Sequence, residues 1–135
     1  NSGAPLTHDF VELFNRGASA VTLSGWSVQY TSATGSGTWQ VTPLSGTIAP
    51  GGYYLVRQAA GSTPSGALPA PDATGAIAMA AGAGKVALQS STAPIVGACP
   101  ASGNVDLIGY GPTASCFEGT GPASAVSNTT AALRK

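Results

Sequence analysis

The chain has 135 residues, only 7% of them charged, and its five basic and five acidic residues cancel. A chain of this length fits one domain, which buries roughly two-thirds of its unfolded surface. The low, scattered charge argues against binding to nucleic-acid phosphates, because that affinity depends on clustered Lys or Arg. No apolar run reaches the length needed to cross a bilayer.

The first half of the chain predicts three strands, and no segment shows the apolar spacing of an amphipathic helix. Residues 9–14 (DFVELF) are β-prone and end at the turn 15–17. Trp26, Val28 and Tyr30 alternate with polar residues, which predicts a half-buried strand. After the Gly-rich turn 34–37, residues 38–42 are expected to complete a hairpin, with Trp39 and Val41 on one face.

Three further strands are predicted in the second half. The turn 49–52 (APGG) precedes a strand over 53–57, whereas 58–72 is too rich in Pro, Gly and Ser for regular structure. Residues 85–89 alternate with Val86 and Leu88 facing inward, and 105–110 alternate in the same way. Residues 113–135 are expected to be mostly loop. Short strands with regularly spaced turns predict a single all-β domain, a sandwich or a barrel.

Cys99 and Cys116 are the only cysteines, and they enclose a segment rich in Gly, Pro, Ser and Ala. This arrangement favours a disulfide formed in an oxidising compartment, and therefore a secreted protein. A staple that closes a loop of this length contributes on the order of 3 kcal/mol. The alternative is a pair of buried free thiols. Two cysteines and the single His8 do not make a zinc set, and no cofactor is expected.

No arrangement of residues typical of catalysis is present, so no catalytic residue is assigned and the chain is expected not to be an enzyme. His8 would have to act as the base of any Ser-His-Asp set, yet it stands near the start of the chain, which we expect to be unanchored. Asp9 and Glu12 are three residues apart on a strand and therefore point to opposite faces. Residues 82–85 (GAGK) do not continue into a phosphate-binding loop, since Val86 follows the lysine.

Three aromatic residues are candidates for contact with a ligand: Trp39, Tyr53 and Tyr54. In the adjacent tyrosine pair one ring must point outward, where it can stack on a sugar or pack on another protein. The alternative is that these rings only cover the sheet. Asp72 and Glu118 lie on predicted loops and are candidates for calcium with backbone carbonyls, although no EF-hand spacing supports them. Glu12, if it faces inward, requires a partner such as Arg57.

Four segments together resemble the lamin tail domain family, namely residues 9–15 (DFVELFN), 21–28 (VTLSGWSV), 48–56 (IAPGGYYLV) and 105–111 (VDLIGYG). Their order and spacing agree with that family over most of the chain. Residues 69–79, Cys99 and residues 113–135 are more similar to the version found in secreted bacterial proteins. The resemblance implies an immunoglobulin-like β-sandwich without an active site of its own. In bacteria such modules accompany secreted nucleases or phosphoesterases, and in animal lamins they bind proteins and, more loosely, DNA.

The chain departs from the family at both ends, where members have further segments, so it is expected to be trimmed. Missing edge strands would leave backbone groups open to pairing with another chain. We therefore expect an extracellular binding or adhesion module of a larger secreted protein, with a protein, cell-surface or polysaccharide ligand. One alternative is a structural subunit that assembles with its own copies through open sheet edges. Another is an accessory substrate-binding domain of a secreted nuclease or phosphoesterase.

Overall fold

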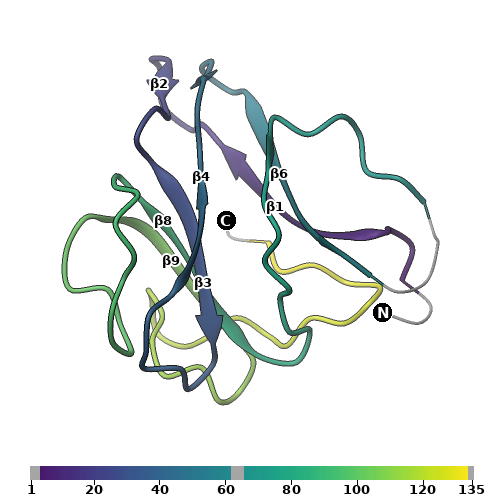
Figure 1. Cartoon of the computed structure of the whole chain (residues 1–135), viewed down its shortest axis with the longest axis vertical. Coiled ribbons are helices and arrows are strands. Elements are labelled where there is room, and N and C mark those ends of the chain that lie inside the picture. The colour runs from purple at the N-terminus through teal and green to yellow at the C-terminus, as the bar shows by residue number, and fades with distance from the viewer. Residues whose placement is uncertain (1–3, 62–65, 134–135) are drawn as a thin grey trace.

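A computed structural model describes residues 4–61 and 66–133, and these form strands, turns and loops (Figure 1). Within this part of the chain, no helix is long and apolar enough to cross a membrane. The strands, in chain order, are β1 (His8–Phe14), β2 (Val21–Thr22), β3 (Ser27–Ser32), β4 (Gln40–Pro43), β5 (Thr47–Ile48), β6 (Tyr53–Ala60), β7 (Ala73–Thr74), β8 (Gly84–Gln89) and β9 (Asn104–Tyr110).

The strands form two main sheets and one short ribbon. One main sheet has the order β1-β6-β7, the other has the order β4-β3-β8-β9, and β2 pairs with β5. All pairs are antiparallel except β6 with β7. The two main sheets lie in separate layers (Figure 1), and the hydrophobic core connects them. The fold is therefore a two-layer β-sandwich.

The main core follows from the alternation of apolar side chains along the strands. Val28 of β3 and Val56 of β6 are almost completely buried, and Val11 and Leu13 of β1 pack against the same cluster. Full burial of such a side chain contributes about 1.5–3 kcal/mol relative to exposure. The predicted inward direction of Val86 and Leu88 is confirmed, because both pack against this cluster. Its other buried members are Leu23, Leu44, Ile48 and Tyr54.

One side of the sandwich, between β4 and β6, is tightly closed. Thr42 and Gln58 are buried there and hydrogen-bond to each other, with the Gln58 Nε2 donating to Thr42 Oγ1 at 3.0 Å. Gln58 Oε1 also accepts from the backbone N–H of Ile77 at 3.1 Å. Gly75 passes so close that a Cβ atom there would collide with both Thr42 and Gln58. This position therefore requires glycine because of space, not because of backbone conformation.

The opposite side, between β1 and β9, is open. A cavity of about 680 Å³ lies there, and the C-terminal residues 126–133 form part of its wall. Apolar side chains of both sheets line it, among them Leu13, Leu88 and Ile108. The sandwich thus has one sealed side and one accessible side.

Most of the strands predicted from the sequence are present. Residues 9–14 and 105–110 lie within β1 and β9, and β3 pairs with β4 as the expected hairpin. Residues 113–133 contain only isolated bridges, as expected for loop. The two-residue strands β2, β5 and β7 were not predicted, because two residues are too few to show a periodicity.

Three expectations are wrong. Strand β6 continues to Ala60, so residues 58–60 are regular; residues 62–65 of the predicted irregular stretch lie outside the described part of the chain. His8 is not on an unanchored end, since it pairs with Ala60 across β1 and β6. Strand β3 is not half-buried, because Ser27 and Gln29 are as fully buried as Val28. The reason is that loop segments cover the outer face of its sheet.

A second, outer core lies beneath those loops. Trp39, Ala87 and Leu107 are buried there, with Ile95 and Cys116 packed against them. The Gln29 side chain fixes one covering segment, because its Nε2 donates to Ala93 O at 2.9 Å and its Oε1 accepts from Ile95 N at 2.8 Å. Polar side chains on the outer face of the four-stranded sheet are therefore buried, and they form hydrogen bonds with the covering loops instead of with water.

Candidate interaction surface

The outward face of the β1-β6-β7 sheet carries the most exposed aromatic side chains of the strands. Because Val11 and Leu13 point into the core, the alternate residues of β1 point outward. The register places Phe10 beside Arg57, Glu12 beside Leu55 and Phe14 beside Tyr53. We call these six residues the β1–β6 face.

Phe14 and Tyr53 form an exposed aromatic pair on this face. They are 49% and 66% exposed, and their ring centroids are 4.7 Å apart with planes tilted by 32°. Cross-strand aromatic pairs of this kind stabilise each other. Each ring still leaves a large area in water, which is costly unless a partner covers it.

The tyrosine pair separates as the strand alternation predicts. Tyr53 points outward, whereas Tyr54 is buried and donates its hydroxyl hydrogen to Ser45 O at 2.8 Å. Phe14 was missed as a candidate, although its position on the outward side of residues 9–14 was visible in the sequence. What the sequence did not show is that Tyr53 stands opposite it.

Trp39 departs from the expectation of a ligand-facing ring. It is only 2% exposed, in the outer core, and its indole Nε1 donates to Gly97 O at 2.9 Å. A tryptophan in this position has its ring faces covered by the protein and its single donor already used. Of the three aromatic candidates, only Tyr53 lies on an open surface.

The acidic candidates, Asp72 and Glu118, have local partners and lie on loops next to different sheets. Asp72 precedes β7, and its carboxylate accepts a hydrogen bond from the backbone N–H of Leu55 at 2.8 Å. Glu118 lies beside β9 and accepts from Asn104 Nδ2 at 3.1 Å. Among the described residues, no group of three or more His, Cys, Asp or Glu side chains is arranged to hold a metal ion. Glu12 is exposed, so it faces water and not the core.

The predicted disulfide between Cys99 and Cys116 is confirmed, with the two Cα atoms 5.6 Å apart. It joins the loop after β8 to the loop after β9. Both loops lie over the outer core, on the side of the molecule away from the β1–β6 face. The disulfide therefore stabilises the four-stranded sheet that these loops cover, and it is not part of the β1–β6 face.

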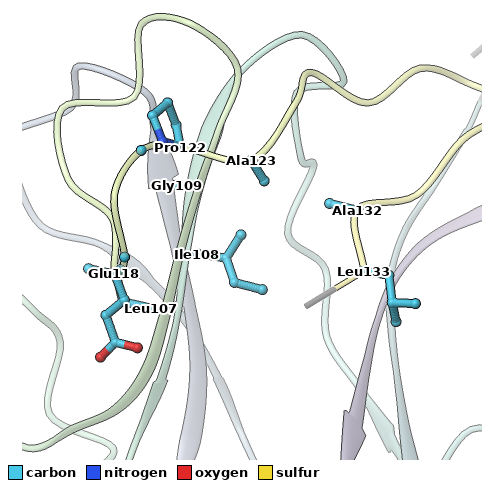
Figure 2. A pocket seen from close by; sticks show the side chains of 10 residues that line it. Leu107, Ile108, Gly109, Glu118, Pro122, Ala123, Ala132 and Leu133 are labelled. Atoms are coloured by element: carbon cyan, nitrogen blue, oxygen red, sulfur yellow. The ribbon is translucent and has the colours of Figure 1, made fainter. Parts of the chain in front are cut away.

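A smaller pocket of about 310 Å³ lies between β9 and the C-terminal segment (Figure 2). Ile108 points from β9 toward the side on which Ala132 and Leu133 lie, whereas the Glu118 carboxylate points away from them (Figure 2). Among the described residues that line it, Glu118 is the only one with a polar side chain. This pocket has the character of a packing gap between β9 and the segment that follows it.

Lys85 and Tyr110, both in the interior of the described part of the chain, have shifted pKa values. Burial, reinforced by the neighbouring Tyr30 hydroxyl, raises the pKa of Tyr110 far above its usual range. The Tyr110 hydroxyl donates to Ala80 O at 2.5 Å. Burial lowers the pKa of Lys85, which lies in the outer core. Neither group lies on the β1–β6 face, and burial in the fold explains both pKa shifts.

The architecture is that of an immunoglobulin-like β-sandwich, in which two sheets enclose one core. The family model described as Lamin Tail Domain matches residues 1–112, and the chain belongs to this family. The family is a non-enzymatic one whose members mediate protein interactions. No curated protein and no solved structure gives a significant match to the chain.

Proposed function

We propose that this chain is a non-catalytic, extracellular binding or adhesion module of a larger, secreted bacterial protein, and that it binds through the β1–β6 face. The observation that carries the proposal is the exposed Phe14–Tyr53 pair on a sheet whose other face is in the core. The disulfide supports an extracellular location.

The composition of this face suits a neutral or weakly polar ligand. The two exposed aromatic rings, Phe14 and Tyr53, provide flat apolar area. Arg57 and Glu12 on the same face provide hydrogen-bonding groups of opposite charge. Aromatic residues are enriched among the residues that carry most of the binding energy in interfaces, and they also stack on sugar rings. A cell-surface polysaccharide or a surface protein fits this description better than a polyanion does.

The test is a co-sedimentation assay on insoluble cellulose, chitin, peptidoglycan and intact bacterial cells. The wild-type protein is expected to bind at least one of these probes. The double variant Phe14→Ala/Tyr53→Ala is expected to bind it at least about thirtyfold more weakly, as for loss of an aromatic hot spot. Because both side chains are exposed, the circular dichroism spectrum is expected to be unchanged.

Phe117→Ala provides the matched control. Phe117 is also an exposed aromatic residue, but it lies next to the disulfide and not on the β1–β6 face. Its removal is expected to leave binding unchanged. Equal binding by the double variant and the wild type, or no binding to any of the four probes, would contradict the proposal.

A second candidate function is self-assembly, and the position of β1 favours it. β1 is at the end of its sheet, and within the described residues no strand pairs with its other edge. Asn15 exchanges hydrogen bonds with Gly51 and Gly52 on the β6 side, so the backbone N–H of Glu12 is expected to point away from β6. Such an edge can pair with the edge of a second copy.

Native mass spectrometry tests this second candidate. Oligomers that dissociate in the variant Glu12→Pro, which lacks that N–H, but persist in Glu12→Ala would support pairing through β1. A strictly monomeric wild-type protein would contradict it.

A further inference from the structure

Lys85 is a charged residue that lies fully buried in this fold. It belongs to β8 and is completely buried on the outer face of the four-stranded sheet, away from the main core. Its Nζ lies 5.4 Å from the centre of the Trp39 ring, a distance that allows a cation–π interaction. An ammonium group so placed must be fully hydrogen-bonded, since leaving water is otherwise prohibitive.

The ammonium has three donors, and three oxygens accept from it. They are Ala98 O at 2.6 Å, Gly35 O at 2.8 Å and Ser115 Oγ at 2.9 Å. None of them is a carboxylate, so these dipoles and the Trp39 ring stabilise the charge. Ser115 is itself fixed, because its Oγ and its backbone N–H both donate to Ala33 O at 3.0 Å.

The position of these oxygens in the sequence ties the lysine to the disulfide. Ala98 directly precedes Cys99, and Ser115 directly precedes Cys116. The two loops that the disulfide joins therefore supply two of the three acceptors of Lys85. Cys99 is exposed, so a dissolved thiol can reach the bond, and these are the only cysteines of the chain.

We propose that Lys85 and the Cys99–Cys116 disulfide form a reduction-sensitive lock over the outer face of the four-stranded sheet. While the disulfide is intact, the loops hold the acceptors in place and keep water from the ammonium. When it is reduced, the loops separate, Lys85 becomes hydrated, and the outer core around Trp39 opens. The main core between the two sheets stays folded, because none of these loops contributes to it.

A dithiol such as dithiothreitol supplies the reducing equivalents. Its thiolate attacks one sulfur of the disulfide and releases the other cysteine as a thiolate. The second thiol of the reductant then displaces the first cysteine, so the protein gains two thiols and the reductant becomes a cyclic disulfide. The opening is favoured because a buried ammonium without an ionic partner gains solvation when water reaches it.

Amine labelling of the native protein tests the lock. The protein is treated with dithiothreitol without denaturant, its thiols are capped with iodoacetamide, and its lysines are acetylated with an activated ester. Peptide mass spectrometry then follows Lys85, with Lys135, the other lysine of the chain, as the internal reference. Reduction is expected to accelerate acetylation of Lys85 at least about tenfold, since a loop-closing disulfide controls local opening by that much or more.

The double variant Cys99→Ser/Cys116→Ser is the control for the capping reagent, and it is expected to label at Lys85 as the reduced protein does. Hydrogen exchange of β6 is expected to stay slow in both. Lys85 that remains unreactive after the disulfide is open would overturn the proposal. So would loss of protection in β6, because the whole domain would then unfold instead of one face.

Discussion

Asn15 joins the turn that follows β1 to the end of β5 through one buried side-chain amide. Its Nδ2 donates to Ser19 O at 2.8 Å and to Ile48 O at 3.0 Å, and a third carbonyl, Ala49 O, lies at 3.2 Å. Its Oδ1 accepts from Gly17 N at 2.9 Å. No other residue type offers both a paired donor and an acceptor of this size.

The variant Asn15→Ala is therefore expected to lose about 2 to 3 kcal/mol of unfolding free energy, because buried carbonyls are left without donors. Urea denaturation followed by circular dichroism measures this loss. Gln40→Ala removes an amide from an exposed position in β4 and is expected to stay within about 0.5 kcal/mol of the wild type. Similar stabilities for the two variants would show that Asn15 does not connect these segments.

Lys85 predicts a specific pH dependence of stability. Burial lowers its pKa below the ordinary value of 10.5, so the folded protein releases this proton at a lower pH than the unfolded chain does. Between the two pKa values the unfolded state binds more protons, and stability therefore rises with pH. The cost of the buried charge is present at neutral pH and is relieved as the pH approaches 10.5.

The measurement is the difference in unfolding free energy between the wild type and Lys85→Met, from neutral pH to about the ordinary lysine pKa. The wild type is expected to gain stability relative to the variant along this range. The raised pKa of Tyr110 affects both proteins alike and cancels in the difference. A difference that does not change with pH would mean that the pKa of Lys85 is not lowered.

At the scale of elements, the seal between β4 and β6 depends on Gly75. The variant Gly75→Ala would bring a methyl group into Thr42 and Gln58, so it is expected to cost about 1 to 3 kcal/mol through overpacking. Gly82→Ala is the matched control, because its added Cβ would meet nothing within 4 Å. Thermal unfolding of both variants compares the two positions. Equal melting temperatures would contradict the claim that close packing at Gly75 closes this side of the sandwich.

The strands that the sequence predicts well are those with one face in water. β1 has Val11 and Leu13 inside and exposed Glu12 and Phe14 outside, and alternation alone identifies it. The same rule fails for β3 and β8, where Gln29 and Lys85 look solvent-facing but are buried. Their cover comes from residues far along the chain, and a local pattern carries no information about such contacts.

At the candidate surface, too, the features that follow from local pattern are predicted and those that depend on distant contacts are not. Tyr53 was identified because adjacent tyrosines on a strand must face opposite ways, which is a local rule. The burial of Trp39 does not follow from a local rule, because its environment depends on Ile95 and Gly97, more than fifty positions later. The Phe14–Tyr53 pair needed the register of β1 against β6, which only the structure provides.

For the whole molecule, the segment after β9 belongs to the domain although the family match ends at residue 112. Val126 and Ala123 pack against the cluster of Tyr30, Ile77 and Tyr110. Ala123 also exchanges backbone hydrogen bonds with Gly109 and Gly111, at 2.8 and 2.9 Å, which covers part of the outer edge of β9. The same segment supplies Cys116, one half of the disulfide.

Truncation after residue 112 is therefore expected to lower the melting temperature by at least about 10 °C, since loss of the disulfide alone costs about 3 kcal/mol. Removal of only residues 131–135 is the control. Leu133 is 83% exposed, so this shorter deletion is expected to change the melting temperature by only about 1 or 2 °C. If the chain of residues 1–112 melts as the full chain does, the matched region folds on its own and the segment is an appendage. If it melts as expected, residues 113–130 are part of the sandwich, because they cover β9 and hold the loops over the outer core.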